Sequence, residues 1–236
     1  MANLVLLPAI GLDAGFWEWV ELPDAEVHKH EFPGFGRRPR AARPPTVDDL
    51  ADDVAGAYAG PLDVVGVSMG GMVAQHLALR HPERVHSMLI ACTGAAVDPA
   101  VMLERARATD AGGIEGVLES TLERWFTRSA LEEEPEHRGV AYARRTLLAL
   151  DPGSFADGWR TMAGHDVRDR LGEITARATC LCGTDDVVGT PERVGELAGG
   201  LQNGCFVMRE GPHMLPLEQP DELSEAIRDH LDWVGA

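Results

Sequence analysis

Short apolar runs and segments with a helical period alternate along most of the chain. The helical segments begin at Thr46 and include residues 70–81, 191–198 and 220–233. Short apolar runs that end at Gly or Pro are typical of buried strands. Strands that alternate with helices predict a mostly parallel sheet with helices on both faces. The predicted strands lie at residues 4–7, 25–32, 62–67, 85–92, 178–182 and 204–209.

One long segment between the fourth and fifth predicted strands has the helical period alone. It extends from about residue 98 to residue 166. Open α/β sheets place their sites at the carboxyl ends of the strands, so we expect this helical insertion to lie over that edge. We therefore predict an α/β fold with a core of residues 1–95 and 170–236 and a helical cap of residues 96–169 inserted into it.

The third predicted strand leads directly into a serine flanked by glycines. In the sequence DVVGVSMGGM, Ser68 lies two residues after Gly66 and two residues before Gly70. A plain turn is one interpretation of this pattern. The other is a nucleophile elbow, in which small residues let strand and helix pass closely while the serine hydroxyl is presented. The following helix, starting at Met69, would also direct free N–H groups toward an oxyanion.

A catalytic serine needs a base, and the base needs an acid that orients it. Among nine histidines we favour His213, because it follows the last predicted strand in the loop REGPHMLPLEQP. The acid should follow the preceding strand, where CGTDD offers Asp185 and Asp186. Spacing after Gly183 favours Asp186, and Asp185 stays the alternative. The chain order of serine, aspartate and histidine is that of the α/β-hydrolases.

Charge and composition narrow the classes of partner. The chain has 21 basic and 38 acidic side chains, a formal net charge of −17, and no basic stripe. We expect no nucleic-acid partner, because phosphate binding needs clustered Lys and Arg. No apolar stretch approaches a membrane span, and MANLVLLPAI lacks the basic region of a signal peptide. The sequence therefore predicts a cytoplasmic protein with a small-molecule substrate and no membrane partner.

The four cysteines all fall in apolar, strand-like segments. Cys180 and Cys182 are two residues apart and would point to the same side of a strand, as a metal-binding pair does. No second Cys/His cluster completes a ligand set, so we interpret the cysteines as buried reduced thiols. The sequence also has no dinucleotide or P-loop glycine motif. We therefore expect no metal and no cofactor.

Over its whole length the sequence resembles the α/β-hydrolase family, with the first strands of larger members absent. LLPAIGLDAGFWEWV resembles the family's oxyanion loop, and EFPGFGRRP resembles the turn after the next strand. The segments LERWFTRSA, LLALDPGSFADGWRTMAGHDVRDRL and CGTDD are similar to those of 3-oxoadipate enol-lactonases and related small-ester hydrolases. The resemblance implies that the backbone N–H groups of Met69 and Ile10 form the oxyanion hole.

Two departures from the family pattern affect this interpretation. Pro8-Ala9 replaces the usual His-Gly, and Arg38 replaces a small hydroxyl residue. Proline has no N–H to donate, but Ile10 keeps its own, so the predicted oxyanion hole survives the change.

Several cap residues are candidates for contact with a substrate. Large apolar residues at helical spacing more often form core, and surface arginines are more often solvated. The alternative interpretation of Arg144 and Arg145 is that they bind a carboxylate of the substrate. The candidate pocket residues are Trp125, Trp159, Met162 and His165.

These features predict a serine hydrolase that cleaves a small carboxylic ester or lactone. Ser68 would attack the acyl carbon, while His213 takes its proton and later activates water. Asp186 would hold the tautomer of His213, and the amides of Met69 and Ile10 would stabilise the oxyanion. Two alternatives stay open. The same fold and triad could serve a lyase, a C–C bond hydrolase or a cofactor-free perhydrolase, or the protein could bind a ligand without catalysis.

Overall fold

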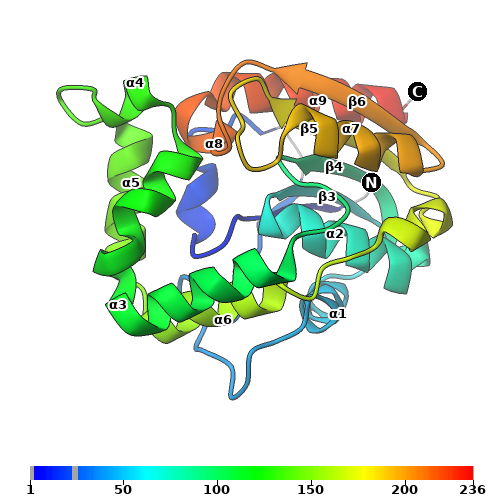
Figure 1. The fold of residues 1–236 in the computed structure, drawn as a ribbon. Coiled ribbons are helices and arrows are strands. Elements are labelled where there is room, and N and C mark those ends of the chain that lie inside the picture. Colours follow the sequence, from blue (N-terminus) through cyan, green and yellow to red (C-terminus); the bar gives the residue numbers. More distant parts are fainter. Residues whose placement is uncertain (1–2, 23–25, 236) are drawn as a thin grey trace.

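A single six-stranded sheet lies at the centre of the computed structural model, which describes residues 3–22 and 26–235 (Figure 1). All strands are parallel, in the order β2-β1-β3-β4-β5-β6, which confirms the predicted sheet. The predicted strand 25–32 forms only a short β2, and its first residue, Ala25, lies outside the described residues. The strands are β1 (Asn3–Leu7), β2 (Val27–Lys29), β3 (Leu62–Val67), β4 (Val85–Ala91), β5 (Arg177–Gly183) and β6 (Gly204–Arg209).

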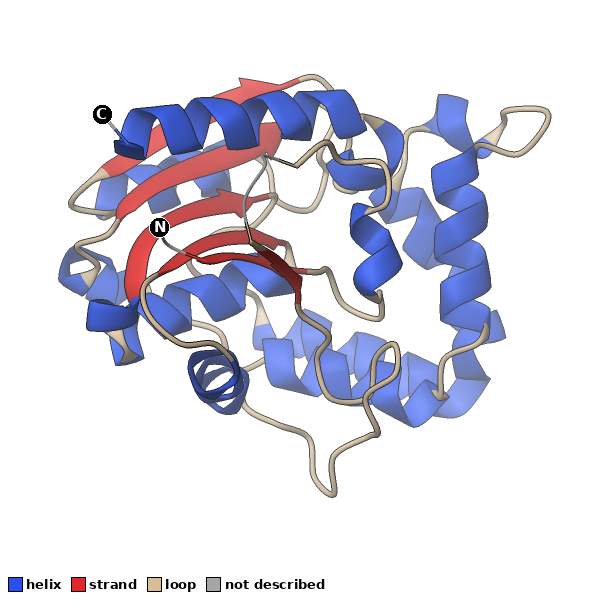
Figure 2. Ribbon diagram, turned by 180° about the vertical axis from the view of Figure 1, so that it is seen from behind, coloured by secondary structure: helices blue, strands red, loops and turns tan. Residues whose placement is uncertain are grey.

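Helices cover both faces of the sheet. On one face lie α2 (Met69–Arg80) and α7 (Pro191–Gly200), and on the other lies α9 (Pro220–Gly235) (Figures 1 and 2). Central strands are therefore buried on both faces, which explains why they appear in the sequence as continuous apolar runs. The remaining short elements outside the cap segment are η1 (Ala14–Trp17), η2 (Pro82–Arg84), η3 (Arg168–Glu173) and α8 (Leu215–Glu218).

A local sequence signal fixes the start of α1 (Val47–Ala57), which packs beside α2. The Thr46 side chain accepts a hydrogen bond from the Asp49 N–H at 3.0 Å, and the Asp49 carboxylate accepts one from the Thr46 N–H at 2.8 Å. This reciprocal capping box satisfies two N–H groups that would otherwise lack partners at the helix start.

The segment between β4 and β5 is mainly helical and lies along the carboxyl edge of the sheet (Figure 1). Its first helix turns a corner at Gly113, whose φ of 65° breaks the helical backbone. The chain enters and leaves this segment side by side, because Ala96 and Asp166 form an antiparallel bridge. We propose on this ground that residues 96–169 form a cap on the core of residues 1–95 and 170–236. The cap helices are α3 (Pro99–Trp125), α4 (Arg128–Leu131), α5 (Arg138–Leu148) and α6 (Pro152–Met162).

The helices within residues 3–22 and 26–235 do not meet the requirements for a membrane span. None of them combines the length and the apolar composition that crossing a bilayer requires.

Candidate active site

Ser68 stands at the sharp junction between β3 and α2, with φ 53° and ψ −114°. This left-handed backbone is strained for a residue with a side chain. A Cβ added at Gly66 would lie 2.4 Å from the carbonyl oxygen of Gly70, and one added at Gly70 would lie 2.1 Å from that of Leu7. Both distances are far below van der Waals contact, so only glycine fits at either position. The glycines therefore allow strand, turn and helix to approach as a nucleophile elbow requires.

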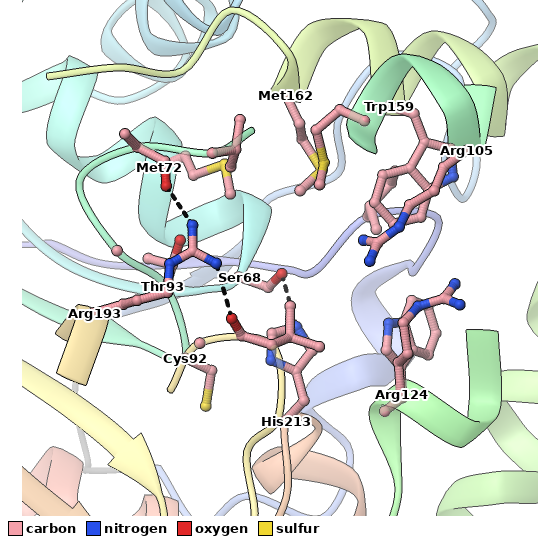
Figure 3. A pocket seen from close by; sticks show the side chains of 18 residues that line it. Ser68, Met72, Cys92, Thr93, Arg105, Arg124, Trp159, Met162, Arg193 and His213 are labelled. Atoms are coloured by element: carbon pink, nitrogen blue, oxygen red, sulfur yellow. Dashed lines mark hydrogen bonds between the residues drawn. The ribbon is translucent and has the colours of Figure 1, made fainter. Parts of the chain in front are cut away.

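A chain of hydrogen bonds joins three residues that follow the ends of three strands. Ser68 Oγ lies 3.0 Å from Nε2 of His213 (Figure 3). Nδ1 of the same ring lies 3.0 and 3.1 Å from the two carboxylate oxygens of Asp186. An ionised carboxylate only accepts hydrogen bonds, so Nδ1 carries the proton and Nε2 accepts from the serine hydroxyl. The structure thus brings together the three residues that the sequence singled out for catalysis, all of them buried.

The environment of Asp186 favours its ionised form. Burial opposes ionisation, but the His213 ring and two backbone N–H groups outweigh it and lower the pKa of the carboxyl. Those N–H groups belong to Val188 and Gly189, and they reach Oδ1 at 2.7 and 2.8 Å. The neighbouring Asp185 is exposed, and its carboxylate accepts a hydrogen bond from Thr184 instead. Of the two aspartates, only Asp186 contacts the histidine.

Two backbone N–H groups beside Ser68 have no hydrogen-bond partner in the described part of the chain. Met69 begins α2, where the first N–H groups of a helix lack intrahelical acceptors. Ile10 follows β1 in the loop of Pro8 and Ala9, and its N–H is likewise unpaired. The resemblance to α/β-hydrolases assigned oxyanion binding to these same two amides. Free N–H groups are what such a site requires.

A pocket opens over Ser68 and His213, with an empty volume of about 500 Å³ that includes its mouth. Most of the residues that line the pocket are apolar and a few are polar, as in small-molecule sites. Three of the four predicted cap residues line it, namely Trp125, Trp159 and Met162. His165 is not among the lining residues: its ring bonds His76 at 3.2 Å and the Gly94 carbonyl at 3.1 Å.

The arginines of the pocket differ from those that the sequence suggested. Arg144 forms ion pairs with Glu119 and Glu136 and does not line the pocket, and Arg145 is exposed beside Tyr142. Their solvated interpretation fits the structure. The pocket is lined instead by Arg105, Arg124 and Arg193.

Sequence reasoning missed these residues, although α3 carried a usable signal. Arg105 lies three residues after Met102 and one before Ala106, both buried, so it shares the inward side of the helix. Thr93 was also missed. It lines the pocket, and its buried hydroxyl has no hydrogen-bond partner among the residues that the structure describes.

Cys92, Asp186 and His213 place possible metal-ligand atoms within 4.8 Å of one another. Two of these residues already bind each other through the His213–Asp186 hydrogen bonds. Burial raises the pKa of the Cys92 thiol well above its usual range, and the charge of Asp186 raises it further. A protonated thiol is a poor metal ligand. This donor set therefore fits a hydrogen-bonded catalytic group better than a metal site.

Known proteins resemble this chain along almost its whole length. A pimeloyl-[acyl-carrier protein] methyl ester esterase of Chromobacterium violaceum is 29% identical, covering 98% of this chain and 94% of its own. The 3-oxoadipate enol-lactonase 2 of Acinetobacter baylyi is 27% identical over 82% of this chain and 74% of its own. The enol-lactonase structure from Burkholderia xenovorans LB400 matches with a TM-score of 0.92 and 26% identity, covering 98% and 91% of the two chains.

The model of the alpha/beta hydrolase family matches residues 4–226, which include the elbow, the cap and the loop that carries His213. The relatives and the solved structure described above are named as an esterase and as enol-lactonases. This chain is therefore an enzyme that belongs to the α/β-hydrolase family.

Proposed function

We propose that this protein is a serine hydrolase that cleaves a small carboxylic ester or lactone through Ser68, His213 and Asp186. One observation carries the proposal. The Ser68 hydroxyl lies 3.0 Å from a histidine nitrogen whose ring is held from the other side by a buried carboxylate. This arrangement supplies the nucleophile, the base and the group that orients the base.

The first half of the reaction forms an acyl-enzyme. Ser68 Oγ attacks the acyl carbon while Nε2 of His213 accepts its proton, and the carbonyl oxygen becomes an oxyanion. The free N–H groups of Ile10 and Met69 donate to that oxygen. The tetrahedral intermediate then breaks its bond to the leaving oxygen, which takes the proton from Nε2 and departs as an alcohol. In a lactone the leaving hydroxyl remains attached to the acyl group.

The second half returns the enzyme to its starting state. Nε2 of His213 takes a proton from a water molecule, and the resulting hydroxide attacks the acyl carbon. Collapse of the second tetrahedral intermediate releases the carboxylic acid and restores the proton to Ser68. Throughout the cycle, the ionised Asp186 keeps Nδ1 of the ring protonated and stabilises the imidazolium form.

Two features support a small substrate of this class. The relatives are named as a methyl ester esterase and as enol-lactonases, so ester and lactone bonds are the natural candidates. The pocket over Ser68 has a mostly apolar lining with a few polar groups, which suits a small organic substrate.

The test compares each member of the hydrogen-bonded chain with a matched control. Ser68→Ala and His213→Ala should each lower kcat on short acyl esters and lactones by about 10⁴-fold or more, and together by little more than either alone, because the residues act as a unit. Asp186→Asn should reduce turnover severely, whereas Asp185→Asn, one residue away and exposed, should be nearly neutral. A fluorophosphonate probe should label the wild type at Ser68 and leave Ser68→Ala unlabelled.

Two results would count against the proposal. A folded wild type that neither reacts with the probe nor cleaves any ester or lactone would indicate ligand binding without catalysis. Equal losses of turnover in Asp185→Asn and Asp186→Asn would contradict a specific role for the buried Asp186 carboxylate.

A further inference from the structure

The pocket over Ser68 has the opposite charge to the rest of the protein. The chain has a formal net charge of −17. Among the described residues that line this pocket, three are arginines and none is Asp or Glu. An acidic protein has no general reason to gather cations around its catalytic serine. This reversal of charge indicates that the pocket receives an anionic group.

None of the three arginines has a carboxylate partner among the described residues, and only Arg193 is held by backbone carbonyls. Arg193 donates to the carbonyl oxygens of Val188 at 3.2 Å and Ala96 at 2.6 Å, and so braces the pocket wall (Figure 3). Within residues 3–22 and 26–235, neither Arg105 nor Arg124 forms an ion pair, and the charges of Glu104 and Glu123 act on them from farther away. The other contacts of these two are modest: Arg105 lies 5.0 Å over the ring of Trp159, and Arg124 donates to Thr121 at 3.1 Å.

The two unpaired guanidinium groups are also close enough to repel each other. Burial and the charge of Arg105 together lower the pKa of Arg124 to about 10. Burial likewise lowers the pKa of Arg105. Both remain protonated at neutral pH, so the pocket holds two partly buried like charges with no carboxylate of the described residues in contact with either. Such an arrangement is unfavourable by itself, and a bound anion relieves it.

The corner in α3 explains how one helix supplies both groups. Arg105 lies before Gly113 and Arg124 lies after it, on the two halves of the helix that meet at this corner (Figure 1). Figure 3 shows both side chains at the end of the pocket away from Arg193, with Trp159 beside Arg105. In a straight helix, side chains 19 residues apart would be roughly 28 Å apart along the axis. The corner instead lets both line one small pocket.

We propose that Arg105 and Arg124 together bind a carboxylate at the end of the substrate opposite the ester or lactone bond. The proposal rests on the proposed hydrolase function and specifies its substrate class: monoesters of short dicarboxylic acids, or lactones that carry a free carboxylate. The rest of the pocket suits the connecting chain, because Met72, Met102 and Met162 present flexible apolar surfaces to it.

The first test compares charged and neutral esters of the same length. We would measure kcat/KM for the monomethyl esters of succinate, glutarate and adipate and for methyl alkanoates with the same number of chain carbons. Wild type should prefer the charged member of at least one pair. Hydrogen bonds to charged groups imply that Arg105→Met and Arg124→Met each lower this preference by about 10- to 100-fold. The loss should appear mainly in KM, because the carboxylate is bound equally throughout the reaction.

Two further variants separate binding from a structural role. Arg107→Met, on the same helix but exposed, should leave the preference and both rates unchanged. Arg124→Lys keeps the charge but loses the two-pronged geometry, so it should retain an intermediate preference. A general packing defect would instead lower the rates of charged and neutral esters together. Equal rates for the two ester classes in wild type, or an unchanged preference in both Met variants, would overturn the proposal.

A binding experiment tests the arginines without catalysis. Ser68→Ala would be titrated calorimetrically with the succinate, glutarate and adipate dianions. At least one should bind, and adding Arg124→Met should weaken that binding by about 10-fold or more. If wild type cleaves neutral esters but no dicarboxylate binds, the hydrolase function stands and the carboxylate site is refuted. If dicarboxylates bind through Arg124 but no ester is cleaved and Ser68 is not labelled, the hydrolase function fails while the anion site stands.

Discussion

Acid should destabilise the protein through His230, which lies on α9 against the sheet and is only 2% exposed. The Ser87 hydroxyl donates to the Asp63 carboxylate at 2.5 Å, so it accepts from Nε2–H of His230 at 3.0 Å. Nδ1 then accepts from the Thr179 hydroxyl at 2.9 Å. The neutral ring is satisfied at both nitrogens, and a second ring proton would need an acceptor where a donor now points. Burial accordingly lowers the pKa of His230 to about 4.

The size of the effect follows from the difference in proton binding between the folded and unfolded states. An unfolded histidine titrates near pH 6.5, so between pH 6.5 and 4 the unfolded chain binds a proton that the folded protein does not. The free energy of unfolding therefore falls as the pH falls through this window. For His230 the loss between pH 7.5 and 4.5 is about 2.5 kcal/mol. Burial also lowers the pKa of His165 to about 4, which adds a loss of about the same size.

Urea unfolding of wild type and His230→Gln at pH 7.5 and 4.5 measures this contribution. Glutamine retains hydrogen-bonding groups in the network but does not titrate. The loss of stability between the two pH values should be about 2.5 kcal/mol smaller in the variant, because the His165 contribution is common to both proteins. Equal slopes of free energy against urea would show that the same surface is exposed in each. A variant that loses as much stability as wild type on acidification would refute the reasoning.

Two other predictions concern the elbow and metals. Gly70→Ala should prevent folding or greatly lower the unfolding temperature, because its Cβ would overlap the Leu7 carbonyl, whereas Gly195→Ala in α7, where a Cβ meets nothing within 4 Å, should stabilise by up to about 1 kcal/mol. A Gly70→Ala protein as stable as wild type in thermal unfolding would contradict the close packing at the elbow. Chelation with EDTA should leave esterase activity unchanged, because His213 and Asp186 already bind each other and burial keeps the Cys92 thiol protonated. Loss of activity that zinc restores would contradict this.

The fold was predictable from the sequence because its main signals are local. The central strands β1, β3, β4 and β5 are largely buried and appear in the sequence as continuous apolar runs. The edge strands β2 and β6 are partly exposed, and β2 is shorter than its predicted range. The position of Ser68 was readable for a similar reason: the glycines two residues before and after it are required by contacts within one short turn and its immediate neighbours. His213 and Asp186 then followed from the rule that sites gather at the carboxyl ends of parallel strands.

The lining of the pocket was not predictable, because it depends on contacts between distant segments. The sequence suggested that His165 lines the pocket. Its ring is instead hydrogen-bonded to His76, which lies 89 positions earlier in the chain. Arg105 and Arg124 face the pocket only because α3 bends at Gly113, and the helical period of the sequence continues across that bend. Arg144 does not face the pocket, because it forms ion pairs with Glu119 on α3 and with Glu136.

The corner at Gly113 places substrate selection and bond cleavage on different parts of the chain. The residues that we propose to break the bond belong to loops at the ends of strands, whereas the two arginines that we propose to bind the carboxylate belong to the two halves of α3. The distance between those cations, and their distance from Ser68, depends on the backbone at a single glycine. Substitutions near Gly113 can therefore change the length of acid that fits while the bond-breaking groups stay as they are.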